Sequence, residues 1–546
     1  MKQYKRSMGP WGLMFSAVSA MIGSGWLFSS MLLTKAVGPI AILVWVLGGI
    51  LILIVAFTYA ELSTTLPVTG GSARFPRFTH GTFVSLTFAW ITWINLMTTA
   101  PIEVQAMLQY TSTYWPSLVH QDTHGLTGRG MSLAALLMVF FCFLNAYSIK
   151  LVNRLNSVLT VWKIAVALIT ALVLIYYMIH AHQVHNFHNP KLGGFNPYGW
   201  NAVFMAISTG GVLFAFNGYK QVVELAGETE NPRRNIIRAL LGSLGIVMVI
   251  YILLQIGFIG ALPISALTHG FSGVSFTGDA GPISGLLMAL GFNIFAILLY
   301  SNAVVATGAA GIVYSTSAGR TLYAMSANSQ LPKFLSKLSG RGIPVYAVLV
   351  NFVLGMTFFL PFKGWHQMIE FMSSVIALSY VSGPVCCLVA RYQIPGAVRK
   401  FKLPFVTLWC FLAFLACACM VFWSGWAIIS KLGGVLLVSL VLFGIYQLCS
   451  TRAQKISWDL RESIWLWVFL VGMMLIAYFS RMAGGGDPVL SNLTSYALVV
   501  ALTAVSLFLA VKFRLAQEKS KAIFDLFLQE VETGKPADLS QAQNRA

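Results

Sequence analysis

Hydrophobic residues follow one another in long runs along nearly the whole chain, separated by short polar stretches. A helix of about 20 apolar residues crosses the hydrocarbon core of a bilayer, and most of these runs reach that length. The pattern predicts about fourteen spanning helices, with approximate bounds 11–35, 40–66, 82–114, 131–149, 155–180, 200–227, 236–261, 283–314, 343–361, 365–391, 404–428, 432–450, 463–480 and 494–512. We therefore expect an all-α polytopic membrane protein.

Composition and charge agree with this expectation. Hydrophobic residues occupy 57% of the 546 positions and charged residues only 9%, which is more apolar surface than a soluble core buries. The formal charge of +19 raises nucleic acid as a partner. When the N-terminus is placed in the cytoplasm, however, about 27 of the 35 Lys and Arg residues fall on the inner side. We therefore predict a multi-pass protein of the cell membrane, with both termini cytoplasmic and no nucleic-acid partner.

A gap of small residues interrupts the first predicted span at Gly23-Ser24-Gly25. At about 1.5 Å per residue the gap lies roughly 18 Å from the start of the span, near the middle of a bilayer. A helix broken there exposes N–H and C=O groups that need protein or a polar cavity as partners. The gap therefore predicts a binding site, although small residues also allow close packing between helices.

The sixth predicted span carries a similar gap from Phe214 to Gly218, with Phe216 roughly 20 Å from the start. Two interrupted helices, each the first of a set of five and entering from opposite sides, indicate an inverted repeat with the binding site at its interface. The chain then divides into a cytoplasmic N-terminus (1–10), a first five-helix repeat (11–181), a second, inverted repeat (200–392), peripheral helices 11 to 14 (404–512) and a cytoplasmic tail (513–546). The peripheral helices face lipid or form an oligomer surface, and Phe524 to Val531 predicts a short amphipathic helix.

Helix direction decides what the two gaps can bind. The half-helix after each break presents free N–H groups and the half-helix before it presents free carbonyls, which suits a zwitterion. We expect a substrate carboxylate on the amides of Ser24, Gly25 and Gly218. Its ammonium group is expected on the carbonyls of Met21, Ile22, Phe214 and Ala215. The predicted substrate-binding residues are Met21, Ile22, Gly23, Ser24, Gly25, Phe214, Ala215, Phe216, Asn217 and Gly218, with Trp26 as a pocket or gate residue or, alternatively, a packing residue.

Three ionisable residues inside the spans extend this site: Glu103, Lys163 and Lys220. Charges at this depth are costly and face the protein interior or a wet cavity. Because burial disfavours a charged lysine, Lys163 is a candidate for proton coupling, unless it is an anchor at the inner interface. Glu103 is a pocket residue that carries a proton, or else a solvated residue at the outer interface. Lys220 either receives a substrate carboxylate or pairs with Glu103 or Glu224.

Other kinds of site have weaker support in the sequence. The seven cysteines lie in or at the ends of predicted spans, as packing residues do, and we predict no metal and no cofactor. Four histidines between His180 and His188 are polar loop residues or, alternatively, a pH-sensing or metal-binding group. The buried charges do not supply an acid, a base and a nucleophile as one set, so we expect no enzyme. A channel would need rings of repeated charge, which the sequence lacks.

Four motifs occur together in the first ten spans. They are Gly23-Ser24-Gly25; Tyr59-Ala60-Glu61-Leu62 with Pro67 and Gly70-Gly71; the gap from Phe214 to Gly218; and the run Gly227-Glu228-Thr229-Glu230-Asn231-Pro232-Arg233-Arg234-Asn235-Ile236. With these motifs the chain resembles the amino acid–polyamine–organocation superfamily. Within that superfamily it resembles bacterial aspartate–proton symporters, through Trp26-Leu27-Phe28, Ile102-Glu103-Val104 and Ser208-Thr209-Gly210-Gly211.

The resemblance implies a leucine-transporter-type fold, a 5+5 inverted repeat with about four additional C-terminal helices, that works by alternating access. It implies a secondary active transporter that imports an amino acid, expected to be acidic (aspartate or glutamate), by proton symport. An amino-acid exchanger, or a symporter for a neutral or cationic amino acid, remains the alternative. Proton-coupled relatives hold a lysine of helix five near the first break, and Lys163 matches it. Its ammonium group is then expected to brace carbonyls around Ile22 and Gly23.

Overall fold

The computed structural model describes residues 8–68, 70–147, 149–275, 281–327, 330–339, 343–449 and 458–533. Of the predicted terminal segments, residues 1–7 and 534–546 lie outside the described residues. Within the described ranges the regular structure is helical, apart from three isolated β-bridges. The predicted all-α class is therefore confirmed.

The region of the first five predicted spans folds into six long helices. They are α1 (Pro10–Met21), α2 (Gly25–Val37), α3 (Ala41–Thr65), α4 (Gly71–Thr111), α5 (Gly128–Tyr147) and α6 (Ile149–His180), with short 3₁₀ helices η1 (Gly38–Ile40) and η2 (Pro116–Leu118). α4 is kinked at Gly81, whose φ of 81° is left-handed and suits glycine. The kink separates a first segment of about three turns from the predicted span that follows it.

The second group of spans begins with a broken helix. Its α-helices are α7 (Gly199–Thr209), α8 (Val212–Phe216), α9 (Lys220–Glu224), α10 (Pro232–Ala261), α11 (Pro282–Ala289), α12 (Asn293–Ala327), α13 (Val345–Phe358), α14 (Gly364–Tyr380) and α15 (Ser382–Gln393). The 3₁₀ helices in this region are η3 (Gln183–Phe187), η4 (Pro190–Leu192), η5 (Asn217–Tyr219), η6 (Ala226–Glu228), η7 (Ile264–Leu267) and η8 (Lys333–Ser336). α10 starts where Pro232 takes the first helical position, because proline there loses no helical hydrogen bond.

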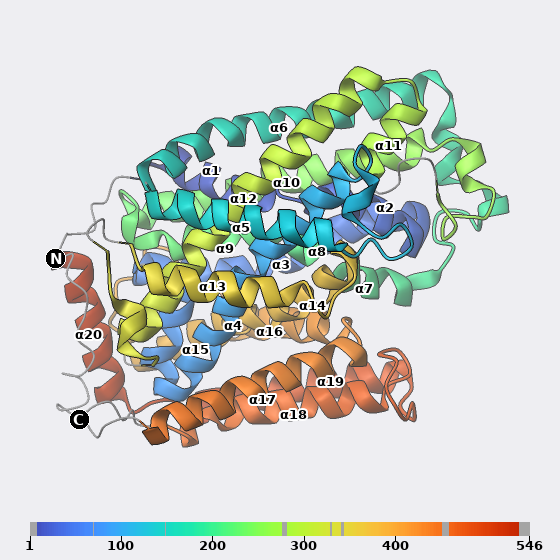
Figure 1. The fold of residues 1–546 in the computed structure, drawn as a ribbon. Coiled ribbons are helices and arrows are strands. Elements are labelled where there is room, and N and C mark those ends of the chain that lie inside the picture. The colour runs from blue at the N-terminus through green and yellow to red at the C-terminus, as the bar shows by residue number, and fades with distance from the viewer. Residues whose placement is uncertain are drawn as a thin grey trace.

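The remaining helices lie outside this core. They are α16 (Val406–Phe422), α17 (Trp426–Cys449), α18 (Ile464–Phe479), α19 (Asn492–Lys512) and α20 (Gln517–Thr533), with η10 (Arg461–Ser463). In Figure 1, α17, α18 and α19 form a layer along one side of the bundle, and α20 crosses one end of it. α20 packs on the first segment of α4, where Arg74 pairs with Glu530 at 2.7 Å and Phe78 meets Phe524. The helix predicted from Phe524 to Val531 is part of α20.

Every predicted span contains helix, but the number of long spans is smaller than fourteen. Ten helices in the described residues are long and apolar enough to cross a membrane, or eleven if the bent pair α7 and α8–α9 counts as one. The difference arises because α13 and α16 are too short for that length criterion and because α2 and α3 count as one segment, Gly25–Thr65. A count of membrane spans that uses only helix length and composition therefore misses spans made of short or broken helices.

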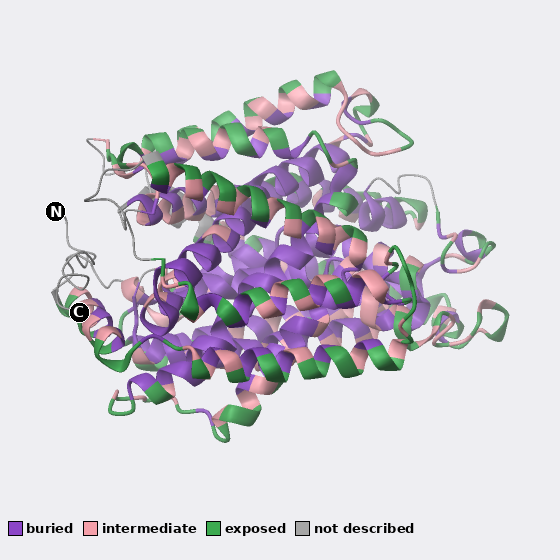
Figure 2. Ribbon diagram, turned by 90° about the horizontal axis from the view of Figure 1, so that it is seen from below, coloured by how far each residue is buried: buried purple, intermediate pink, exposed green. Residues whose placement is uncertain are grey.

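Burial separates central helices from peripheral ones. The most apolar window of α14–α15 is 100% buried and that of α4 is 89% buried, whereas those of α5 and α17 are only 28% buried. Figure 2 shows the same gradient, with buried residues inside the bundle and exposed residues along the outer helices. A helix that is apolar all round and still exposed needs a lipid-like environment. α4 and α14 are therefore the helices placed to shape an internal site.

Candidate functional site

The first break lies where the sequence predicts it. α1 ends at Met21 and α2 begins at Gly25, and Ser24 is the N-cap residue of α2. Two backbone bonds close the end of α1, from Ile22 N–H to Val18 at 2.8 Å and from Gly23 N–H to Met21 at 3.0 Å. The whole stretch is buried, so its remaining polar groups depend on protein partners.

Three neighbouring helices supply partners to the last carbonyls of α1. Each donates one hydrogen bond: Lys163 Nζ of α6 to the Ser19 carbonyl at 2.9 Å, Tyr314 of α12 to Ala20 at 3.3 Å, and Tyr251 of α10 to Met21 at 2.8 Å. Tyr251 also donates to the carbonyl of Ala215 at 3.2 Å, so a single hydroxyl joins the two interrupted helices. The negative end of the α1 dipole is therefore met by donors from three sides.

The contact of Lys163 corrects the predicted one. Its ammonium group was expected near Ile22 and Gly23, but it binds the carbonyl and, at 3.2 Å, the hydroxyl of Ser19. Ser19 lies about one turn before the break, because α6 passes α1 at that level. Lys163 is fully buried, and its hydrogen bonds connect α6 to the last turn of α1. They do not reach across the gap between α1 and α2.

The N–H end of the break is occupied by Glu103 of α4. Its Oε2 accepts a hydrogen bond from the Ser24 N–H at 2.9 Å, and its side chain lies directly over Gly23, where a Cβ would overlap Oε1. Trp365 of α14 donates to the Ser24 hydroxyl at 2.9 Å. Glu103 is 1% exposed, so the alternative that it is a solvated end residue is wrong.

The second break lies earlier than the sequence analysis placed it. The helix bends by 47° between α7 and α8, at Gly210 and Gly211, and Gly211 adopts a left-handed φ of 85°. Phe214 and Phe216 therefore belong to a helical turn. The paired glycines bend because they pack on α2: a Cβ on Gly210 or Gly211 would overlap the side chain of Leu33 or Ser29, respectively. A further irregular turn, η5, follows at Asn217–Tyr219.

Asn217 pairs with a residue that the sequence analysis missed. Its side-chain amide exchanges two hydrogen bonds with that of Asn95 in α4, at 2.8 Å and 3.2 Å. The hydroxyl of Tyr380 in α14 donates to the same Asn217 oxygen at 3.3 Å. Gly218, the next residue, faces α1, because a Cβ there would lie 2.5 Å from the carbonyl carbon of Ala20. The predicted role of the Gly218 amide as a carboxylate ligand stays a prediction.

The remaining predicted residues lie around this centre. Lys220 donates to Ser379 at 3.3 Å, and its ammonium group lies 5.4 Å and 5.3 Å from the ring centres of Tyr59 and Tyr380. Among the described residues it forms no direct ion pair with Glu103 or Glu224, but its charge interacts with that of the nearby Glu224, so the pairing with Glu224 stays a prediction. Two aromatic residues complete the set: Trp26 is fully buried, and Phe216 packs on Trp45 and Tyr251 behind the break.

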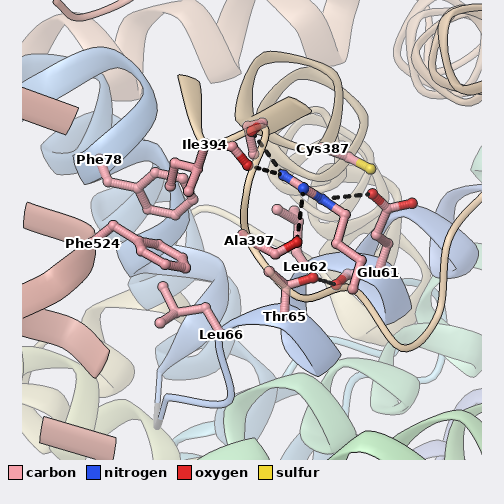
Figure 3. A pocket seen from close by; sticks show the side chains of 11 residues that line it. Glu61, Leu62, Thr65, Leu66, Phe78, Cys387, Ile394, Ala397 and Phe524 are labelled. Carbon is pink, nitrogen blue, oxygen red and sulfur yellow. Dashed lines mark hydrogen bonds and ion pairs between the residues drawn. The ribbon is translucent and has the colours of Figure 1, made fainter. Parts of the chain in front are cut away.

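Glu61, a motif residue near the end of α3, forms a separate charged cluster. It accepts two hydrogen bonds from Arg391, at 2.5 Å and 2.7 Å, and one from the Leu403 N–H at 2.8 Å, and it lies 3.5 Å from Arg399. Figure 3 shows the pocket beside it, with Glu61 on one side and Phe78 and Phe524 on the other. The cluster joins the ends of α3 and α15 close to α20.

Replacing Glu61 with glutamine should destabilise the protein by about 3 kcal/mol, because Arg391 and Arg399 lose the buried counter-charge that Glu61 provides. Unfolding of the purified variant in detergent measures the change. Glu370→Gln is the matched control, because Glu370 pairs with His366 at 3.7 Å on an exposed helix face and such a pair contributes about 0–1 kcal/mol. Equal stability of the two variants would contradict a structural role for the Glu61 cluster.

Comparisons with known proteins agree with this geometry. A family model described as amino acid permease matches residues 8–446. The glutamate/serine transporter AimA of Bacillus subtilis (strain 168) is 32% identical over 493 residues, which cover 89% of this chain and 90% of that protein. An aspartate-proton symporter of the same organism is 30% identical over 515 residues, which cover 93% and 96%. The family and these relatives are transporters, not enzymes.

A solved structure supports the fold. MHP1, a nucleobase-cation-symport-1 family transporter in a closed conformation with bromovinylhydantoin bound, aligns with a TM-score of 0.52 and 14% sequence identity. The alignment covers 100% of this chain and 97% of that one. The chain therefore has the leucine-transporter-type fold, with peripheral helices in addition, and is a membrane protein.

Proposed function

The chain belongs to the amino acid permease family, and we propose that it is a secondary active transporter that imports an acidic amino acid, aspartate or glutamate, by proton symport. The observation that carries this proposal is the enclosed first break, which brings together the carbonyls that end α1 and the N–H groups that begin α2. Such a pair of ends recognises the ammonium and carboxylate groups that all amino acids share. We propose as well that the substrate is bound by the ten residues predicted from the sequence, at the two helix interruptions. The ranges 11–181 and 200–392 are proposed to be the two halves of the inverted repeat.

Proton coupling is proposed to run through Lys163 and Glu103. Lys163 in its charged form donates to the end of α1, and losing its proton weakens that tie between α6 and α1. A change at this contact would let α1 move between states that open to opposite sides, as alternating access requires. The distribution of Lys and Arg supports a cell-membrane location with both termini in the cytoplasm.

An uptake experiment tests the proposal. Proteoliposomes that contain the purified protein, with an imposed inward proton gradient and no sodium, are expected to accumulate labelled aspartate or glutamate above their outside concentration. Unlabelled amino acids of each class compete in parallel samples, and liposomes without protein provide the background. Accumulation should disappear when an uncoupler removes the gradient.

The same experiment separates the alternatives. Serine is included because one relative is a glutamate/serine transporter. Accumulation of only neutral or cationic amino acids would contradict the acidic substrate and leave the fold unaffected. Uptake that requires an amino acid inside the liposomes and ignores the proton gradient would identify an exchanger.

A further inference from the structure

The carboxylate of Glu103 binds the backbone N–H of Ser24 at the first break. In the proposed function, the carboxylate of the substrate binds at this same position. Glu103 Oε2 accepts the Ser24 N–H at the start of α2, where the dipole of a 13-residue helix favours a negative charge. A glycine at position 23 lets the carboxylate lie against the backbone. The side chain of Glu103 thus occupies the Ser24 N–H, the group that the carboxylate of an incoming amino acid would bind.

A side chain of α4 also binds the second interrupted helix. Asn95 also belongs to α4, and its amide satisfies both polar atoms of the Asn217 side chain. Asn95 and Glu103 lie eight residues apart, about 12 Å along the helix axis, so one helix serves both broken segments. Polar side chains of α4 thus bind the N–H end of the first break and the Asn217 side chain in η5, which follows the second break.

From these contacts we infer that Glu103 is an internal competitor of the substrate. While its carboxylate is charged it holds the Ser24 N–H, and a proton on Glu103 removes that charge and releases the amide to the substrate carboxylate. The inference rests on the proposed amino-acid site and makes Glu103 a positioning residue for binding. Because the substrate carboxylate can bind only after Glu103 is protonated, this competition would couple the entry of a proton to the entry of an anionic substrate.

Charge balance around Glu103 favours an acidic substrate. The titratable groups that act on or face it are Lys163 of α6, Tyr251 of α10 and Tyr314 of α12, all buried. With Glu103 and Lys163 both charged, this region is neutral. If Glu103 takes a proton and an amino acid of net charge −1 enters, it stays neutral, whereas a neutral amino acid leaves an unpaired buried positive charge, which is costly.

Equilibrium binding of labelled aspartate to the purified protein tests the inference. At alkaline pH, Glu103→Gln is expected to bind about tenfold more tightly than the wild type, the effect of removing one charge-assisted competing hydrogen bond. At acidic pH the two proteins should bind alike, because the wild-type carboxyl is then protonated as well. The ratio of the two Kd values at each pH is the readout, and the inference predicts that this ratio changes between alkaline and acidic pH.

Two variants make this test specific. Glu103→Asp keeps the charge but is one methylene shorter, so it withdraws from the Ser24 N–H and should also bind more tightly than the wild type; it decides the question if Glu103→Gln does not fold. Glu370→Gln is the control, since Glu370 is a carboxyl on a partly exposed face of α14 that pairs with His366 outside the breaks, and its Kd should match that of the wild type. Weaker binding by Glu103→Gln, or a Kd ratio that does not vary with pH, would overturn the inference. A wild type that binds none of aspartate, glutamate and serine would contradict the proposed function instead.

Discussion

Alanine in place of Lys163 is expected to reduce proton-driven accumulation of the amino acid to the level of liposomes without protein, while some exchange of labelled for unlabelled substrate remains. Lys163 is fully buried, and its ammonium group donates to the carbonyl of Ser19 at the end of α1. Alanine removes both the proposed proton carrier and the tie between α6 and α1. Exchange needs only the loaded states, so it tolerates this loss better than net uptake does.

Two controls separate coupling from folding in this experiment. Ser19→Ala keeps the backbone carbonyl that receives the main hydrogen bond, so it should retain most of the proton-driven uptake. Lys512→Ala removes a lysine from an exposed helix end and should leave uptake unchanged. Full proton dependence in a well-folded Lys163→Ala protein would show that another group carries the proton.

The sequence predicted the first break correctly because its signal is local. Gly23, Ser24 and Gly25 weaken a helix whatever surrounds them, and the structure interrupts the helix at these residues. The second break was placed too late because two local signals compete there. The run from Phe214 to Gly218 contains an asparagine and a glycine, but Gly210 and Gly211 are the residues that the packing on α2 bends.

Side-chain partners could not be predicted, because they depend on how helices distant in sequence are rotated about their axes. Tyr251 and Tyr314 look like ordinary aromatic residues of apolar spans, yet their hydroxyls meet the carbonyls of α1 from 230 and 294 residues away. The sequence shows an ionisable residue, Glu103, inside a predicted span, where a charge is costly without a partner. That this partner is the Ser24 N–H follows only from the position of α4 beside the break.

The same limit applies to Glu61. Its motif was visible in the sequence, but Arg391 lies 330 residues further along the chain and reaches it only because α15 packs against α3. Asn95 gave a weaker signal, as one of three side-chain amides in an apolar span that also carries Gln105 and Gln109. A polar residue at such depth indicates a partner without identifying it.

Alanine at Gly218 is expected to destabilise the protein by about 1–3 kcal/mol and to abolish transport, because the two interrupted helices meet there. A methyl group on Gly218 would lie 2.5 Å from the carbonyl carbon of Ala20 and closer still to the amide nitrogen of Met21. Backbone atoms cannot move aside as a flexible side chain does, so α1 and η5 would have to separate. A second crossing has the same geometry, since a Cβ on Gly25 would lie 2.8 Å from that of Ala215.

Thermal unfolding of the purified variants and uptake into proteoliposomes measure this effect, with Gly245→Ala as the control. Gly245 lies within α10 with no atom within 4 Å of its Cβ position, so alanine there should be neutral or should stabilise the helix by up to about 1 kcal/mol. Both substitutions add the same methyl group to a glycine, and they differ only in what surrounds it. If Gly218→Ala transports and unfolds like Gly245→Ala, the two broken helices do not need their close crossing, and a binding site shared between them would lose its structural basis.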